Sequence, residues 1–399
     1  MSEFGLDLSK DQRFITEDEH VRMGRAEVVP GDVIYTIAGS IGNACVVSGV
    51  DRANINQAIA RIKPLQRILP QYLADFLNTS FGRLQSRRVA NGGVQLNINF
   101  SEVKALRLLA PPLEIQKRFI EELAAARGDY ASALVEATRL LESIDDYLLG
   151  ELEIVLPAEV ESTISSRIFS TQHRNLSGWR LDPLFHAFKF WPAIARASVT
   201  QKKLGHCCDY LKSGFAAGAA MQLFDDKGVI HIRPTNLDTN RQLIFARNVY
   251  LDSALLDERP DDVVLPGEVL FNNTNSQELV GKTTYMDIEG QQFFCSNHMT
   301  RIGTNESILN AEYLTAVLNM YQRLKVFFSL CTNWNNQSGI NVDVLRVLPI
   351  PLPDIKTQCE IVLHIRTIQQ TANQLRQQAE VDLKIAKQRI EAKLLGDPT

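Results

Sequence analysis

The sequence predicts an α+β protein: two α/β domains joined by two long antiparallel coiled-coil helices, produced by an internal duplication. Two observations carry this prediction. Apolar residues recur at steps of three and four near residues 113–150 and again near 354–396, as on one face of a helix. Short motifs also recur in the same order in both halves of the chain, which indicates a repeated unit.

Both helices are predicted from their apolar stripes. The stripe of the first is Ile115, Phe119, Leu123, Ala126, Tyr130, Leu134, Ala137, Leu141, Ile144 and Leu148. The stripe of the second is Ile361, Ile365, Ile368, Ala372, Leu375, Ala379, Leu383, Ala386, Ile390 and Leu394, and Gly396 and Pro398 are typical helix-stop residues. Two matching seams favour an antiparallel coiled-coil pair, whereas two unrelated core helices are the alternative.

The repeat is the more specific signal. The sequence from Val28 to Tyr35 returns from Val264 to Phe271, each with a Pro-Gly turn before an expected strand. Further along, the 56–62 segment matches 297–302, and a short helix near 71–78 matches one near 312–319. Pro111 and Gln116 match Pro353 and Gln358, just before each long helix. Each copy is therefore predicted to consist of a domain, then a proline-rich segment that leaves the domain (the exit), and then a long helix.

These landmarks set the expected boundaries. The first domain is expected at 1–112, the first long helix at 113–150, a linker at 151–177, the second domain at 178–353 and the second long helix at 354–396. The first copy has far fewer residues before its Pro-Gly turn than the second, so it is expected to be incomplete at its amino-terminal side.

Composition excludes several classes of protein. With 399 residues and 45% apolar content the chain is long enough for more than one core, and the net charge of −4 argues against a general nucleic-acid coat. No apolar run is long enough to span a membrane, and the first residues are too polar for a signal peptide. The six cysteines are scattered, so we expect reduced thiols and a cytoplasmic location.

No catalytic or metal-binding constellation is expected. Val280-Gly281-Lys282-Thr283 resembles the end of a phosphate-binding P-loop, but Ser276 stands where that motif needs its first glycine. The seven histidines have no ligand spacing, and the thiols of Cys207 and Cys208 lack a partner that could orient them for catalysis.

Amide and hydroxyl side chains instead gather on expected turns of the second copy. Amides can pair with adenine edges, Arg and Lys can pair with guanine or phosphate, and an aromatic ring can stack or wedge. The candidates there are Lys212, Ser213, Arg233, Thr235, Asn236, Asn272, Asn273, Thr274, Asn275, Ser276, Lys282, Asn297, His298, Asn333, Trp334, Asn335, Asn336 and Gln337. The first copy offers Thr36, Ser40, Asn43, Asn56, Gln57, Arg88, Asn91 and Gln95. The alternative is that these residues only make the local hydrogen bonds of ordinary turns.

The chain resembles the DNA-specificity subunits of type I restriction–modification systems over nearly its whole length. The resemblance rests on residues 270–276 with 278–283, on 232–237, and on the exits 109–117 and 350–358. It implies two target-recognition domains, each reading one half of a split DNA site, with the helices setting the gap between the halves. The chain departs from the family in its shorter first domain.

The resemblance also implies partners and cofactors. Double-stranded DNA and two modification (methyltransferase) subunits are expected, with ATP-driven motor subunits in restricting complexes. The chain itself is expected to be non-catalytic and to bind no cofactor or metal, while its partners use S-adenosylmethionine, or ATP and Mg²⁺. Partner-contacting positions are expected on the helices at Phe119, Leu123, Tyr130, Leu134, Leu141, Ile365, Ile368, Leu375, Leu383 and Ile390.

Two alternatives stay open at this point. The chain could serve a methylation-linked phage-defence system that does not cleave DNA as type I enzymes do. It could also be a coiled-coil scaffold that keeps the fold and reads no DNA.

Overall fold

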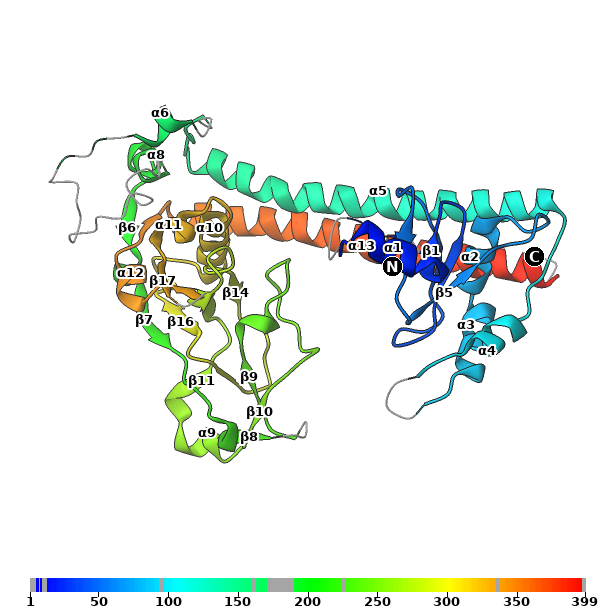
Figure 1. The fold of residues 1–399 in the computed structure, drawn as a ribbon. Helices are drawn as coiled ribbons and strands as arrows, with labels where there is room; N and C mark the ends of the chain where they lie inside the picture. The colour runs from blue at the N-terminus through cyan, green and yellow to red at the C-terminus, as the bar shows by residue number, and fades with distance from the viewer. Residues whose placement is uncertain are drawn as a thin grey trace. The chain divides into compact units, whose positions relative to one another are not determined.

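The computed structural model describes residues 5–6, 8, 13–92, 96–158, 163–168, 170, 172, 190–223, 227–334 and 337–396. The chain forms two compact units. Unit 1 comprises residues 1–139 and 371–399, and unit 2 comprises residues 140–370. Figure 1 labels many of the elements of both units. The expected start of the second domain at Gly178 lies outside the described residues.

Unit 1 contains a small α/β domain. Its short elements are α1 (Glu17–Arg22), η1 (Gly24–Ala26), β1 (Glu27–Val28), β2 (Val33–Thr36), β3 (Ala44–Val46), β4 (Ala53–Asn54), β5 (Ile59–Ile62), α2 (Pro70–Leu77), α3 (Ser80–Val89) and α4 (Phe100–Ala105). Strands β3, β2 and β5 form one antiparallel sheet, and β1 pairs with β4. Apolar residues of β2 and α2 share one core with Phe119, Leu123 and Ile390 of the long helices.

Unit 2 contains the larger domain. Its helices are α6 (Ile164–Arg167), α8 (Phe190–Arg196), α9 (Leu255–Glu258), α10 (Ala311–Arg323), α11 (Val326–Leu330) and α12 (Val342–Arg346), with short 3-10 turns at Leu204–His206, Ala219–Met221, Pro234–Asn236 and Pro260–Asp262. Its strands are β6 (Gln201–Lys203), β7 (Cys208–Ser213), β8 (Gln222–Leu223), β9 (Val229–Ile232), β10 (Tyr250–Leu251), β11 (Val263–Val264), β12 (Val269–Asn272), β13 (Thr274–Asn275), β14 (Thr283–Tyr285), β15 (Phe293–Cys295), β16 (Met299–Thr304), β17 (Thr332–Trp334), β18 (Gln337–Gly339) and β19 (Pro349–Pro351).

The sheets of unit 2 repeat those of unit 1 and add to them. The order β14-β12-β16 matches β3-β2-β5, and the pair β11-β15 matches β1-β4. In unit 2, strand β7 is added next to β16, and strands β9, β10 and β8 are added in that order next to β15. In the described part of unit 1, no strand corresponds to β7 through β10. Over the residues that the structure describes, the first copy thus keeps the central sheet without the strands that enlarge it in the second copy.

Equivalent asparagines fasten a helix to a strand in both copies. The Asn78 side chain accepts a hydrogen bond from the Ala44 amide at 3.1 Å and donates one to the Ala44 carbonyl at 2.7 Å. Asn319 does the same with Thr283, at 3.0 and 2.8 Å. A side-chain amide suits this position because it can satisfy the donor and the acceptor of one strand residue at once. This shared geometry confirms the duplication.

The exits to the long helices are also built alike. Gln116 accepts from the Leu69 amide and donates to the carbonyls of Arg67 and Pro111, all at 2.8–2.9 Å. Gln358 accepts from the Asn310 amide and donates to the carbonyls of Ile308 and Pro353, all at 2.9–3.0 Å. Both glutamines are completely buried, so each exit has a fixed internal anchor.

The long helices α5 (Leu113–Glu151) and α13 (Ile355–Leu395) pack antiparallel within each unit. In unit 1, Arg118 and Phe119 line a pocket with Lys393 and Leu394, whereas Leu123 and Arg127 line the next one with Lys387. In unit 2, the ring of Tyr147 lies 4.1 Å from that of His364. In unit 1, early residues of α5 therefore lie beside late residues of α13. In unit 2, a late residue of α5 lies beside an early residue of α13, as expected for paired antiparallel helices.

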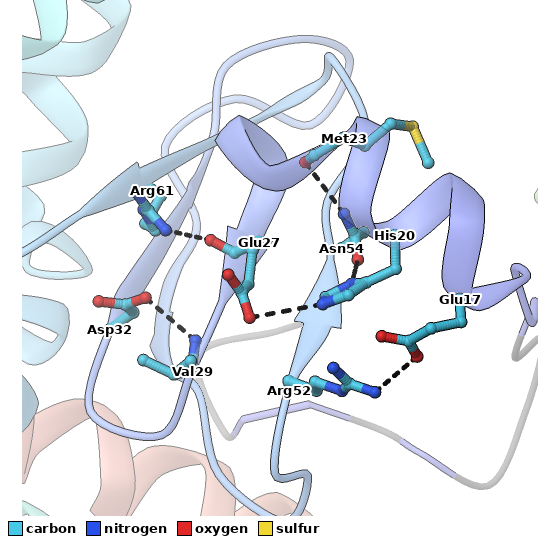
Figure 2. Close-up of polar contacts among 9 residues, drawn as sticks. All are labelled: Glu17, His20, Met23, Glu27, Val29, Asp32, Arg52, Asn54 and Arg61. Carbon is cyan, nitrogen blue, oxygen red and sulfur yellow. Dashed lines mark hydrogen bonds and ion pairs between the residues drawn. The ribbon is translucent and has the colours of Figure 1, made fainter.

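Polar contacts fasten the beginning of unit 1 (Figure 2). Arg52 pairs with Glu17 at 2.6 Å, and the His20 ring lies 2.5 Å from the Asn54 side-chain oxygen. Asn54 in turn donates to the Met23 carbonyl at 3.2 Å, so α1 is held against β4. These contacts join a short helix to a short strand, neither of which would be stable alone.

Candidate nucleic-acid interface

A three-stranded ribbon unites two loops that are far apart in the sequence. β13 pairs with β18, where Thr274 lies opposite Gly339 and Asn275 opposite Ser338. β18 also pairs with β17, where Trp334 lies opposite Gln337. The candidates Thr274, Asn275, Asn333, Trp334 and Gln337 therefore belong to one sheet, β13-β18-β17.

Strand β17 and the start of β18 carry exposed polar side chains and one exposed indole. Asn333 and Gln337 are exposed, and Trp334 is 45% exposed. A Cβ atom on Gly339 would lie 2.4 Å from the Trp334 ring, so the ring rests on the glycine backbone. The Asn333 side chain accepts from the Ser338 hydroxyl at 2.6 Å. The ribbon thus presents a supported aromatic ring beside amides, while Asn335 and Asn336 lie outside the described residues.

The remaining candidates lie at the strand ends next to this ribbon. Asn272 is opposite Met299, and Ser213 is opposite Thr300, so the end of β7, the end of β12 and the start of β16 coincide. β15 runs parallel to β9 and ends beside it, which brings Arg233 to the turn containing Asn297. We call these strand ends, together with the β13-β18-β17 ribbon, the polar edge of unit 2.

Three of the predicted amides are interior residues of this edge. Asn272 is fully buried and donates to the Leu279 carbonyl at 3.1 Å, and Asn273 donates to the Thr300 hydroxyl at 3.0 Å. Asn236 is buried and donates to the Ile244 carbonyl at 3.0 Å while accepting from the Arg233 amide at 2.9 Å. The expectation that these three amides read bases is corrected: their hydrogen bonds close the fold, and burial removes them from any ligand.

The other residues of the polar edge are accessible. Lys212, Ser213, Thr235, Ser276 and Asn297 are exposed, and Arg233, Thr274, Asn275, Lys282 and His298 are half-buried. The Lys212 ammonium lies 5.3 Å from the centre of the Tyr210 ring, a cation–π contact that leaves it at the surface. The ends of the strands thus bring Lys212 and Lys282, from the β14-β12-β16-β7 sheet, to the same edge as Arg233, which follows β9.

Unit 1 presents a smaller set. The Thr36 hydroxyl donates to the Ser40 carbonyl at 2.6 Å, and the Asn43 side chain donates to the same carbonyl at 3.1 Å, so these three residues close a turn. Asn56 accepts from the Ala58 amide at 3.0 Å in another turn. These contacts match the alternative of local hydrogen bonding. Gln57 and Arg88 are exposed, and Gln95 lies outside the described residues.

A counterpart of the ribbon persists in unit 1. Asn97 forms bridges with Ala38 and with Asn91, and the two Asn97–Asn91 backbone hydrogen bonds are 2.8 and 2.9 Å long. In the repeat, Ala38 is the position equivalent to Thr274 of the second copy, and Asn91 is equivalent to a position in strand β17. Asn91 and Asn97 are exposed, although Asn91 donates at 2.5 Å to the Glu102 carboxylate.

Half of the helix positions predicted to contact partners are interior. Phe119, Leu123, Leu383 and Ile390 are buried in unit 1, and Ile365 is buried in unit 2. Tyr130, Leu134, Leu141, Ile368 and Leu375 are half-buried. The stripe that the periodicity detects is the seam inside each unit. Exposed apolar residues off that seam, which the periodicity missed, are Val135, Leu363, Val381 and Ile385.

The described residues include no group of three potential metal ligands. Burial raises the pKa of Cys45 to about 11 and that of Cys208 to about 12, so these thiols are poor nucleophiles. Lys282 precedes strand β14 and not a helix, which removes the P-loop interpretation. No helix in the described part of the chain is long and apolar enough to cross a membrane.

Comparison with known proteins agrees with this geometry. A profile of the type I restriction modification DNA specificity domain matches residues 229–384. The StySPI type I restriction enzyme specificity subunit of Salmonella potsdam is 24% identical over 314 residues, which are 77% of this chain and 60% of that protein. The putative MjaX specificity subunit of Methanocaldococcus jannaschii is 27% identical over 115 residues, 29% of this chain and 27% of that protein.

A solved structure shares the fold. It comes from work on complex assembly and conformational transition of the type I R-M system, with 18% identity, a TM-score of 0.54, and coverage of 93% of this chain and 83% of that one. The shared architecture is that of a protein with duplicated α/β domains and two long helices. Residues 229–384 thus match the type I restriction modification DNA specificity domain, and the chain is similar to specificity subunits of type I restriction enzymes. It spans 60% and 27% of the length of the two curated relatives.

Proposed function

We propose that this chain is the non-catalytic DNA-recognition subunit of a type I restriction–modification complex and reads a bipartite double-stranded site. The observation that carries the proposal is the polar edge of unit 2. Exposed amides, hydroxyls and cations from several strand ends meet there beside the supported ring of Trp334. Such a set combines groups that discriminate base edges with groups that bind phosphates.

The roles divide by chemistry. Asn275, Asn333 and Gln337 are the amides available for base edges, and Trp334 supplies a surface for stacking or wedging. Lys212 and Arg233 supply charge for the backbone, and Ser213, Thr235 and Ser276 supply hydroxyls. The buried Asn236, Asn272 and Asn273 hold these groups in register.

The duplication suggests how one chain serves a split site. Each copy is joined to the long helices by the same buried glutamine anchor, Gln116 or Gln358, so the helices are suited to act as the spacer between two half-sites. Half-sites read from one side of a duplex are separated by about one turn, ~34 Å, or multiples of it.

The partners follow from the family. Two modification subunits that use S-adenosylmethionine would flip and methylate the target base, and ATP-driven, Mg²⁺-dependent motor subunits would join in restricting complexes. Exposed apolar residues on the long helices are the docking candidates: Val135, Val381 and Ile385 in unit 1, and Leu363 in unit 2. A cytoplasmic location fits such an assembly.

Unit 2 is proposed to carry most of the sequence readout, because unit 1 lacks counterparts of β7 through β10 among its described residues. The test begins by selecting the preferred duplex from random sequences with the chain bound to its modification subunits. Each base pair of the selected site is then substituted and the Kd measured. One half-site should show penalties of about 1–3 kcal/mol per base pair and the other much smaller ones. Equal discrimination at both halves would overturn the assignment.

A further inference from the structure

Helix α3 of unit 1 carries an exposed basic face. Arg87 and Arg88 stand in its last turn, and both side chains are exposed. A third exposed arginine is joined to the same helix, because the Gln85 side chain donates to the Arg107 carbonyl at 2.9 Å and accepts from the Arg107 amide at 2.7 Å. Gln85 and Arg88 are three residues apart, so they share one side of the helix. We call Arg87, Arg88 and Arg107 the arginine face of unit 1.

The charge of the arginine face is not neutralised. None of its three side chains forms an ion pair or a hydrogen bond with another residue that the structure describes. From Phe76 to Ser101 the sequence contains three arginines and no acidic residue. One carboxylate, that of Glu102, reaches the turn after α3, where it accepts from the Asn91 side chain at 2.5 Å and from the Asn99 amide at 2.7 Å. Three exposed cations against one hydrogen-bonded carboxylate leave this surface positive.

The rest of unit 1 fixes α3 in place. At the start of the helix, the Ser80 amide donates to the Glu391 carboxylate of α13 at 2.8 Å. In the middle, the buried Ser86 hydroxyl is hydrogen-bonded to the Tyr35 hydroxyl of β2. Ser80 and Arg88 are about 12 Å apart along the axis at 1.5 Å per residue, so the charge of Glu391 belongs to the other end of the helix. The arginines therefore extend from a fixed support.

The arginine face adjoins the unit 1 counterpart of the ribbon. Helix α3 ends at Val89, and Asn91, which forms the bridge with Asn97, follows two residues later. In unit 2, α11 holds the corresponding place directly before β17, the strand that bears Trp334. The arginines of unit 1 therefore stand beside the part of the fold that corresponds to the polar edge of unit 2.

The two copies differ in charge at this place. Counted from the equivalent asparagines that fasten a helix to a strand in each copy, Arg87 and Arg88 correspond to Phe328 and Ser329. Helix α11 is mostly buried, including Ser329. Cations in the last turn of a helix stabilise its dipole, which accounts for two of the arginines. It does not account for Arg107, which is held at the side of α3.

We propose that the arginine face holds the DNA backbone through phosphate contacts, so that unit 1 supplies affinity without base preference while unit 2 reads the sequence. The inference rests on the proposed function and deepens it by naming the contacts of unit 1. A guanidinium group binds a phosphate through paired N–H donors. Phosphate contacts fix the position of a duplex and carry no direct sequence information.

The test compares Arg87→Gln, Arg88→Gln, Arg107→Gln and the triple variant, each assembled as the whole chain with its modification subunits on the selected duplex. Each single variant should bind about eightfold more weakly at ~0.1 M salt, because affinity varies with salt to the power of about −0.9 for each phosphate contact. The slope of log K against log salt should shrink by about 0.9 in each single variant and by about 2.7 in the triple variant. The ranking of substituted sites should stay the same.

Arg67→Gln is the matched control. Arg67 is an exposed arginine of unit 1 without an ion pair among the described residues, and its carbonyl accepts from Gln116 at the exit to α5. Unchanged slopes in all three single variants, or an equal drop in Arg67→Gln, would overturn the proposal. A changed ranking of base substitutions in the triple variant would also overturn it, since the face would then read bases.

A variant that keeps the charge separates phosphate binding from damage to the fold. Replacing the same three arginines by lysine should restore most of the slope, because an ammonium still neutralises a phosphate. If the lysine and glutamine triple variants have the same reduced slope, the loss comes from structure, such as the helix dipole, and the proposal is wrong.

The unsubstituted assembly distinguishes failure of the proposed function from failure of this inference. If it prefers no sequence, the proposed function fails, whatever the variants do. If it prefers a sequence and the glutamine variants keep its salt slope, the assignment of the arginine face alone fails.

Discussion

The Arg301 guanidinium donates two hydrogen bonds to the Glu268 carboxylate, at 2.5 and 2.8 Å, and both side chains are at most 4% exposed. Arg301 also donates to the Asp261 carbonyl at 2.8 Å, and the Tyr210 hydroxyl donates to Glu268. The pair joins the residue before β12 to the middle of β16.

Removing one partner of this pair should be strongly destabilising. We expect Arg301→Ala to lower the free energy of unfolding by about 3–5 kcal/mol, because the Glu268 carboxylate would be left buried and unpaired. Urea unfolding followed by circular dichroism measures the change. Arg52→Ala is the control, since its pair with Glu17 is 54% and 63% exposed and should contribute less than about 1 kcal/mol. Similar losses in the two variants would contradict this account.

The duplicated asparagines give a matched pair of variants. Asn78→Ala and Asn319→Ala should each cost about 1–3 kcal/mol, because each leaves a buried strand amide and carbonyl without partners. Denaturant titration of the whole chain is the measurement. A neutral effect at either position would mean that the shared geometry does not support the fold in that copy.

Asn273 and Asn275 are expected to act differently although they stand close together in the sequence. Asn273→Ala should lower stability by about 1–3 kcal/mol, since Asn273 is 6% exposed and bonds Thr300. Asn275→Ala should leave stability within about 0.5 kcal/mol and reduce base discrimination at one position. Melting curves and binding to substituted duplexes separate the two. Loss of discrimination without loss of stability in Asn273→Ala would reverse the assignment.

Trp334 should contribute to DNA affinity through its ring. Trp334→Ala is expected to weaken binding by about 1–3 kcal/mol, and Trp334→Phe should restore part of it. Gly339→Ala should act like Trp334→Ala, because a Cβ there would lie 2.4 Å from the ring and displace it. Val347→Ala, an exposed apolar residue outside the polar edge, serves as control. Full affinity in Trp334→Ala would remove the ring from the interface.

His231 should make the stability of unit 2 depend on pH. Its ring is 1% exposed and its Nε2 donates to the Phe215 carbonyl at 3.2 Å; burial, and then the charge of Arg233, lower its pKa to about 4. Because the folded pKa lies below the unfolded value near 6.5, this contribution is present above pH ~6.5 and is lost as pH falls toward ~4. The loss should be about 1.4 kcal/mol per pH unit. Urea unfolding from pH 7 to 4.5 should show this slope in the unsubstituted chain and not in His231→Leu.

Local sequence signals are enough to identify the duplication and the two long helices. Pro-Gly turns before equivalent strands, the glutamine exits, and an apolar stripe free of proline depend on local conformation and spacing, which residues near one another dictate. Gly396, with φ of 84° at the end of α13, is a helix stop of the kind that residue type alone predicts. The family resemblance rests on the same local motifs.

Which polar residues are free to bind emerges only from the folded chain. Asn272 and Asn275 look alike in the sequence, but Leu279 takes the side-chain hydrogen bond of the first, while the second stands on a ribbon completed by residues 332–339. A side chain's donors and acceptors can be counted from sequence, whereas their occupation depends on contacts between distant residues.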